Sequence, residues 1–144
     1  MKIAVISDIH GNMEAVEAVM EDISKQQCDK IFVLGDYAMA GPEPNYAVDY
    51  FMERKDNPMF KMIQGNTDLM IADYSDELYA KLKEKAPVMA EALKNDAEIL
   101  NPVQKSFLKN LPIQLEVTEG GVKFLLVHGS PRKNNEDILP NTPI

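Results

Sequence analysis

The sequence has 144 residues, enough for about one domain with a core of its own, and its 45% of apolar residues is ordinary for a globular protein. Fifteen Lys and Arg against 23 Asp and Glu leave a net charge of −8, which argues against a broad basic surface for nucleic acid. A single cysteine, Cys28, excludes an intrachain disulfide and a zinc cluster built on cysteines.

The N-terminal segment predicts neither a signal peptide nor a membrane span. Its apolar run begins after Lys2 and breaks at Ser7, and no stretch approaches the ~18 apolar residues that a membrane span needs. Together with the single cysteine, these features lead us to expect a cytoplasmic protein.

The first part of the chain predicts alternating strands and helices. Three short apolar runs, each ending in a polar or glycine-containing cluster, predict buried strands at 2–7, 30–34 and 60–64. Apolar residues at helical spacing predict an amphipathic helix over 13–26, and Pro44 is well placed to open another after a loop at 37–45. This order favours parallel strands in a layered α/β fold.

The second part changes from helix to strand. Residues 68–96 predict helix, mostly exposed and broken at Pro87. Asn101 and Pro102 are typical of a helix start, and the apolar side of that helix is supplied by Val103, Phe107 and Leu108. Alternation over 113–117, a Gly-Gly turn and an apolar run over 122–127 predict a β-hairpin.

Polar side chains follow the ends of the first three predicted strands and of the last strand of the predicted hairpin. The set consists of Asp8, His10, Asp36, Asn66 and His128, and it includes both histidines of the sequence. Taken singly, an Asp or Asn after a strand is equally typical of a cap or turn. Because the carboxyl ends of parallel strands meet at one edge of a sheet, the whole set predicts a metal site there.

The residue types indicate which metals fit. Asp8 and His10 are two residues apart, so in extended chain both side chains point to the same side. Oxygen and imidazole ligands without thiolate favour Mn, Mg, Fe or Zn. Asp36 follows Gly35 on what should be the central strand, and it is the natural bridge between two divalent ions at the ~3.5 to 4 Å spacing of two-metal hydrolases.

Four short motifs occur in order along the chain: Asp8-Ile9-His10-Gly11-Asn12, Gly35-Asp36, Gly65-Asn66-Thr67-Asp68 and Val127-His128-Gly129-Ser130-Pro131. They resemble the motifs of the calcineurin-like metallophosphoesterase superfamily, and most of all its small bacterial and archaeal phosphoesterase branch. The resemblance runs from residue 2 to about residue 132. It implies a single metallophosphoesterase domain over 1–144, with a three-layer to four-layer fold of the αββα type.

The resemblance also implies a role for each residue of the set. Asp8 and His10 would ligate a first divalent metal, Asn66 and His128 a second, and Asp36 would bridge both. The catalytic residues would then be Asp36, Asn66 and His128, around a hydroxide held between the metals that attacks phosphorus. Asn12 and Arg132 are candidates for binding phosphate oxygens, although Asn12 also fits the cap of the first helix.

Two features depart from the family pattern. Many relatives have a histidine, credited with protonating the leaving group, where this chain has Thr67. The pattern also continues to a Gly-His-x-His segment whose histidines complete both metal spheres, whereas no histidine follows His128 here. We therefore expect an incomplete second sheet, with an apolar face that favours a homo-oligomer.

Two functions remain open from the sequence. The first is a metal-dependent phosphoesterase that hydrolyses a small phosphomonoester or phosphodiester, with no membrane partner. The alternative is a catalytically impaired or inactive remnant that serves as a metal-binding or self-associating subunit. A generic nucleotide-binding module is disfavoured because no Gly-x-Gly-x-x-Gly follows the first strand.

Overall fold

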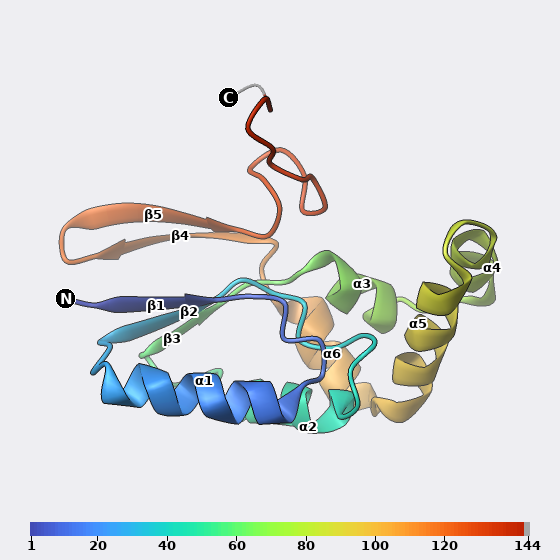
Figure 1. The fold of residues 1–144 in the computed structure, drawn as a ribbon, viewed down its shortest axis with the longest axis horizontal. Helices are drawn as coiled ribbons and strands as arrows, with labels where there is room; N and C mark the ends of the chain where they lie inside the picture. Colours follow the sequence, from blue (N-terminus) through green and yellow to red (C-terminus); the bar gives the residue numbers. More distant parts are fainter. Residues whose placement is uncertain (143–144) are drawn as a thin grey trace.

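A computed structural model describes residues 1–142. Over this range the chain forms two sheets and six helices (Figure 1). The strands are β1 (Ile3–Ile6), β2 (Lys30–Val33), β3 (Phe60–Met62), β4 (Gln114–Glu119) and β5 (Val122–Val127). The helices are α1 (Met13–Lys25), α2 (Pro44–Met52), α3 (Asn66–Ala72), α4 (Asp76–Lys85), α5 (Pro87–Ile99) and α6 (Pro102–Asn110). The predicted α/β class is confirmed.

The first sheet is parallel, with strand order β1-β2-β3. The central strand β2 is apolar throughout its buried part, and Ile31, Phe32 and Val33 are each at most 1% exposed. A strand with neighbours on both sides and packing on both faces requires such a run. The prediction that β2 is central is therefore confirmed, and the carboxyl ends of all three strands lie at one edge.

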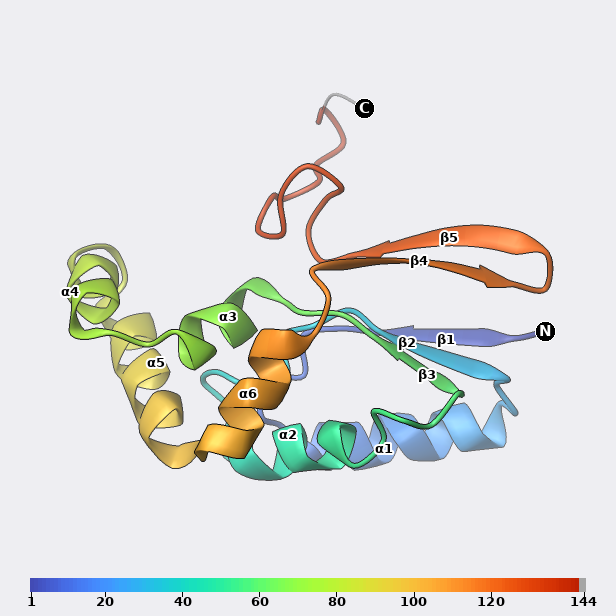
Figure 2. The same ribbon diagram turned by 180° about the vertical axis from the view of Figure 1, so that it is seen from behind.

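The hairpin of β4 and β5 is the second sheet within the described residues, and it is antiparallel. Figures 1 and 2 show it over one face of the first sheet, with α1 and α2 on the other. Leu126 of β5 packs on Phe32 and Ile63, and the rings of Phe32 and Phe124 meet edge to face at 5.6 Å. These contacts give the layer order helix, sheet, hairpin.

The helix starts follow the sequence signals. The Asn12 side chain caps α1 by accepting from the Ala15 N–H at 3.0 Å. Pro44 opens α2, and Asn101 forms a capping box with Gln104 at the start of α6. One expectation about α6 is wrong, because Val103 is 65% exposed. The buried face of this helix includes Leu108, as expected, and Gln104, while Phe107 packs partly buried against the core.

The segment 68–96 is largely exposed, as expected, but parts of it also join the core. It contributes three helices, of which only α4 has no buried residue. Ile71 of α3 and Leu93 of α5 are fully buried and join the main core. The break at Pro87 is confirmed, since α5 begins there. No helix within residues 1–142 has the length and apolar character needed to cross a membrane.

Candidate metal centre

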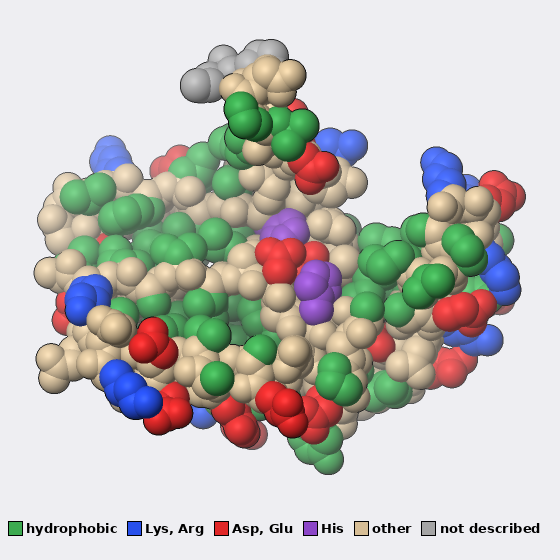
Figure 3. Space-filling view, in the orientation of Figure 1, with side chains coloured by type: hydrophobic (Ala, Val, Ile, Leu, Met, Phe, Trp, Pro, Cys, Tyr) green, Lys and Arg blue, Asp and Glu red, His purple; other side chains and the backbone are tan. Residues whose placement is uncertain are grey.

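The five polar side chains predicted to converge lie at one edge of the first sheet. Asp8 and His10 follow β1, Asp36 follows β2, Asn66 opens α3 after β3, and His128 follows β5. In the space-filling view the His side chains stand beside acidic ones at the middle of this face (Figure 3). Parallel strand ends thus bring together residues that are far apart in the sequence.

One group of possible ligands consists of Asp8, His10 and Asp36. One ligand atom from each lies within 4.8 Å of the others. His10 Nε2 is 3.7 Å from Asp8 Oδ1 and 3.8 Å from Asp36 Oδ2. Asp36 is 3% exposed, whereas Asp8 is open to solvent, so this group has a buried wall and an accessible side.

A second group consists of Asn66, His128 and the same carboxylate of Asp36. His128 Nε2 is 3.0 Å from Asn66 Oδ1 and 3.5 Å from Asp36 Oδ2. The Oδ2 atom of Asp36 therefore faces both histidines, one from each group. This is the position that a bridging ligand would have to occupy.

The histidines are oriented by backbone carbonyl groups. His10 Nδ1 lies 3.0 Å from the Met39 oxygen, and His128 Nδ1 lies 2.7 Å from the Leu34 oxygen. A carbonyl oxygen only accepts, so each Nδ1 donates a proton to its carbonyl group, and the Nε2 atom of each ring is directed at the site.

The donor set fits a cation. When only Nδ1 of His128 carries a proton, His128 Nε2, Asn66 Oδ1 and Asp36 Oδ2 are all acceptors, and they face one another at 3.0 to 3.5 Å. Lone pairs that converge in this way require positive charge between them, either a proton or a metal ion. Imidazole nitrogen with carboxylate and amide oxygen suits Mn, Fe, Zn or Mg.

Three of these residues have left-handed backbone conformations. The φ angles of Asp8, His10 and Asp36 are 57°, 48° and 58°. Such angles are uncommon for residues other than glycine, and they persist where surrounding structure enforces them. The two connections after β1 and β2 therefore form tight turns that hold the side chains over the sheet edge.

Close contact between two strand ends explains the glycines that precede Asp36 and Asn66. A Cβ on Gly35 would lie 2.2 Å from the Gly65 nitrogen, and a Cβ on Gly65 would lie 2.0 Å from Asp36 Oδ1. The backbones of these two turns cross with no room for a side chain. This approach places Asp36 and Asn66 beside each other.

Asp68 is a site residue to which the sequence analysis gave no role. Its fully buried carboxylate accepts from the N–H groups of Asp36 and Gly65, both at 2.8 Å, and of Tyr37 at 2.9 Å. Burial raises the pKa of Asp68 to about 6, and the nearby charge of Asp36 adds to the increase. The sequence signal was an Asp in the first turn of a helix, reaching back to free amides.

The polar groups of Thr67 are both used within the fold. Its N–H donates to Asp36 Oδ1 at 2.9 Å, and its hydroxyl donates to the Ala38 oxygen at 3.3 Å. The first contact holds one carboxylate oxygen of Asp36 and leaves Oδ2 for the site. The side chain of Thr67 is buried and supplies no acid group.

The two predicted phosphate contacts have partners of their own. Asn12 is the N-cap of α1, while it also lines a depression that includes Asp8. Arg132 donates through Nε and Nη2 to Glu136, each at 3.1 Å. Arg132 and His128 line the same shallow pocket of about 340 Å³, so Arg132 lies on the side of the site formed by the C-terminal segment.

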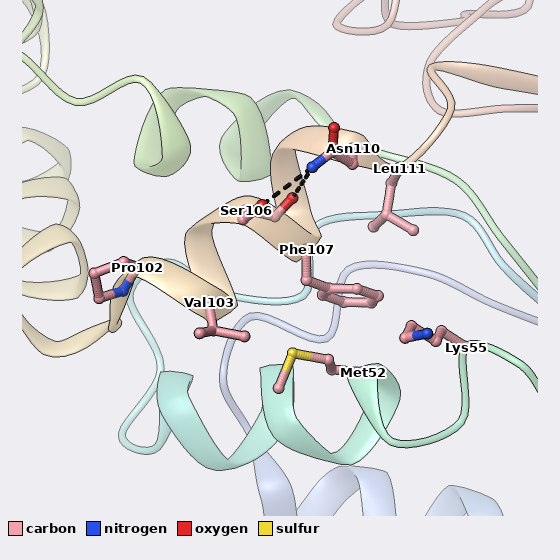
Figure 4. Close-up of a pocket in the computed structure, with 8 residues that line it drawn as sticks. All are labelled: Met52, Lys55, Pro102, Val103, Ser106, Phe107, Asn110 and Leu111. Atoms are coloured by element: carbon pink, nitrogen blue, oxygen red, sulfur yellow. Dashed lines mark hydrogen bonds between the residues drawn. The ribbon is translucent and has the colours of Figure 1, made fainter.

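Four of the five ligand candidates open onto a polar pocket of about 570 Å³. Asp8, Asp36, Asn66 and His128 line it, together with the turn 134–137. An apolar groove of about 530 Å³ lies between α2 and α6, where Met52, Val103 and Phe107 converge (Figure 4). That groove has no comparable set of oxygen and imidazole groups, so metal chemistry belongs to the polar pocket.

The pattern that defines the calcineurin-like phosphoesterase superfamily domain matches residues 1–142 of this chain. The chain belongs to this superfamily. The predicted family is therefore confirmed, and the match runs through every motif at the sheet edge.

The chain is also similar to a curated archaeal protein. An uncharacterized protein of Methanocaldococcus jannaschii is 32% identical over 131 residues, which are 90% of this chain and 50% of that protein. The chain thus spans about half the length of this curated relative.

Two solved structures have the same fold as this chain. A metallophosphoesterase from Sphaerobacter thermophilus is 31% identical, with a TM-score of 0.72 over 96% of this chain and 51% of that one. A hypothetical protein from Pyrococcus horikoshii OT3 is 27% identical, with a TM-score of 0.86 over 98% of this chain and 60% of that one.

Proposed function

We propose that the chain carries the metal centre of a phosphoesterase that hydrolyses a small phosphomonoester or phosphodiester with two divalent ions. The observation that carries this proposal is the position of Asp36 Oδ2, 3.8 Å from His10 Nε2 and 3.5 Å from His128 Nε2. One carboxylate oxygen shared by two histidine groups is the arrangement that a pair of bridged cations requires.

Each group of side chains would hold one ion. Asp8 and His10 would bind the first, Asn66 and His128 the second, and Asp36 both, with Mn, Fe, Zn and Mg as the candidates. When bound, the ions supply Lewis-acid stabilisation of phosphoryl oxygens and an activated water. Family membership and the Asp8-His10-Asp36 cluster support the use of divalent metal.

The protein's own contribution is to keep these donors fixed and electron-rich. Thr67 N–H holds one oxygen of Asp36, and backbone carbonyls hold the Nδ1 protons of both histidines. We further propose that the Nδ2 amide of Asn12 and the guanidinium of Arg132 contact phosphate oxygens. Their places beside Asp8 and His128 support these two assignments.

Thr67 bears on the substrate. Its hydroxyl donates to the Ala38 oxygen and has no acid function, so this position cannot protonate a poor leaving group. We therefore propose substrates with good leaving groups, such as aryl or nucleotide phosphate esters. The single cysteine, Cys28, is compatible with a cytoplasmic setting, which is part of the same proposal.

The test compares wild type with Asp36→Asn and with Asp56→Asn as the control for a lost carboxylate. Asp36→Asn turns an N–H₂ donor toward the histidines or breaks the contact with Thr67, so we expect it to lose bound Mn²⁺ and at least about 100-fold in aryl phosphate hydrolysis. Asp56 is exposed and away from the strand ends, so its variant should match wild type. An active, metal-replete Asp36→Asn protein would refute the proposal.

A second proposal, of self-association, has a specific observation in its favour. Val122 of the hairpin lies on the same face as Phe124 and Leu126 and is 54% exposed, and Val5 on the edge strand β1 is 59% exposed. Apolar side chains also show in the opening between the hairpin and the first sheet (Figure 3). We propose that a second copy covers this face. Sedimentation should give a dimer mass that Val122→Lys halves, and a monomeric wild type would contradict it.

A further inference from the structure

One buried carboxylate of the helical segment lies close to the metal centre and has no part in the proposed function. Asp96 belongs to α5 and follows Leu93 by three residues, so both side chains face the core side of the helix. Only 1% of Asp96 is exposed. Burying a carboxylate is unfavourable unless hydrogen bonds compensate, and burial accordingly raises the pKa of Asp96.

The principal partner of Asp96 is the backbone after β2. Asp96 Oδ2 accepts from the Met39 N–H at 2.7 Å, and Asp96 Oδ1 accepts from Asn95 Nδ2 at 3.3 Å. The Met39 contact is the shorter one and involves a charged acceptor, which makes it the stronger of the two. It joins residues that are 57 positions apart in the sequence.

The segment held by this contact is strained and orients His10. Met39 and Ala40 have φ angles of 90° and 69°, in the left-handed region that residues with a side chain seldom adopt. The carbonyl oxygens of Met39 and Ala38 lie 3.0 and 3.3 Å from His10 Nδ1. A conformation of this kind needs an external constraint, and the carboxylate of Asp96 provides one.

We propose that Asp96 is a positioning residue: by holding the Met39 N–H it fixes the carbonyl groups to which the His10 ring donates. The Nδ1 proton of His10 is then retained and Nε2 is aimed at Asp8 and Asp36. That His10 binds a metal ion rests on the proposed function. The tautomer of its ring, in contrast, can be measured without any ion.

The consequence is that α5 supports the metal centre. Outer groups that orient a ligating histidine raise its affinity for metal by about 10- to 100-fold in other proteins.

The direct test reads the tautomer of His10 in metal-free protein. Long-range ¹H–¹⁵N spectra resolve the ring nitrogens, because the sequence has two histidines and His128→Gln assigns them. Wild type should show protonated Nδ1 and unprotonated Nε2 at His10. Asp96→Leu, which removes the acceptor at similar volume, should convert a substantial share of the ring to the Nε2–H form. A folded Asp96→Leu protein with the wild-type tautomer would overturn the positioning role.

Asp96→Asn keeps the test decisive if Asp96→Leu does not fold. Asn retains an acceptor for the Met39 N–H but loses the charge, so the His10 tautomer should be that of wild type. The Met39 amide proton should move upfield, since a neutral acceptor forms the weaker hydrogen bond. An unmoved Met39 resonance would count against the contact and hence against the proposal.

Metal affinity gives a second readout, measured with Co²⁺ by its visible absorption. We expect Asp96→Leu to bind Co²⁺ about 10- to 100-fold more weakly than wild type. Gln104→Leu is the matched control. Gln104 is also fully buried, but it donates to Asn45 and Asp49 of α2 and not to the segment that orients His10. This variant should lose stability and leave the His10 tautomer and Co²⁺ affinity unchanged.

The outcomes separate the two proposals. If Gln104→Leu shifts the His10 tautomer as much as Asp96→Leu, general loosening accounts for the effect and the positioning role is refuted. If wild type binds no Co²⁺ or Mn²⁺ while the tautomers respond as expected, the positioning role is supported and the proposed phosphoesterase function fails.

Discussion

Asp68 lies directly behind Asp36, and its buried carboxylate accepts the Asp36 N–H at 2.8 Å. The same carboxylate also accepts from Tyr37 and Gly65, so one side chain holds the backbone of two strand ends. The bridging position of Asp36 therefore depends on a residue that does not face the pocket. This relationship leads to the first two predictions.

Asp68→Asn should destabilise the protein. The amide has one acceptor atom in place of two, so at least one buried N–H loses its partner, at about 1 to 3 kcal/mol in the free energy of unfolding. Asp73→Asn on the same segment is the control, since that carboxylate is partly exposed and pairs with Lys109 at the surface. In urea unfolding, the free energy of unfolding of the control should fall by no more than about 0.5 kcal/mol. Equal urea midpoints for both variants would contradict the role of Asp68 in holding the two strand ends together.

The raised pKa of Asp68 predicts a pH dependence of stability in metal-free protein. Burial raises this pKa from 3.8 to about 6. Between these values the folded state keeps a proton that the unfolded chain has released. Its contribution is fully present below about pH 3.8 and is lost as the pH rises through about 6, with a total of about 3 kcal/mol.

The measurement compares the free energy of unfolding of wild type and Asp68→Asn between about pH 4 and about pH 7. The variant cannot titrate at this position, so the advantage of wild type should shrink as the pH rises. An advantage that grows over this range would show that the folded-state pKa is lowered.

Gly35→Ala and Gly121→Ala form a matched pair. Both glycines have positive φ, 95° and 80°, so both substitutions carry the cost of a left-handed alanine, about 1 kcal/mol. Gly121 opens onto free space, whereas a Cβ on Gly35 would meet the Gly65 nitrogen at 2.2 Å. Gly35→Ala should therefore cost at least about 3 kcal/mol or fail to fold, measured by thermal unfolding. Similar melting temperatures for the two variants would refute the close contact between the backbones at Gly35 and Gly65.

Asn12→Ser separates capping from phosphate binding. Serine caps a helix about as well as asparagine, so stability should stay within about 0.5 kcal/mol of wild type. The variant lacks the Nδ2 donor, and loss of one hydrogen bond to a charged group should raise KM for an aryl phosphate by about 10-fold or more. An unchanged KM would leave Asn12 with the cap alone. Asn12→Ala should add a loss of about 1 kcal/mol.

The sequence predicted the convergence of the site because parallel strands have a fixed direction. Once 2–7, 30–34 and 60–64 were read as strands, the side chains after them had to meet at one edge. The choice of Asp36 as the central residue followed from the same order and is consistent with the observed sheet. Their role as metal ligands stays a prediction.

The supporting residues could not be found in this way. Asp96 reaches Met39 from 57 positions away, and nothing in the local pattern of α5 distinguishes it from an exposed acid. Val103 was placed on the wrong face because two faces of a short helix carry apolar residues, and packing against α2 and α3 decides which one is buried. Such choices depend on tertiary contacts rather than on spacing.

The ring of His128 contacts both sheets. Its Nδ1 donates to the Leu34 oxygen after β2 at 2.7 Å, while its own backbone continues from β5. This hydrogen bond joins the hairpin to the first sheet, in addition to the apolar contacts around Phe32. An ion held between Asp36 and His128 would thus resist separation of the two sheets. The stability of their packing would then depend on how much of the protein has an ion bound at this position.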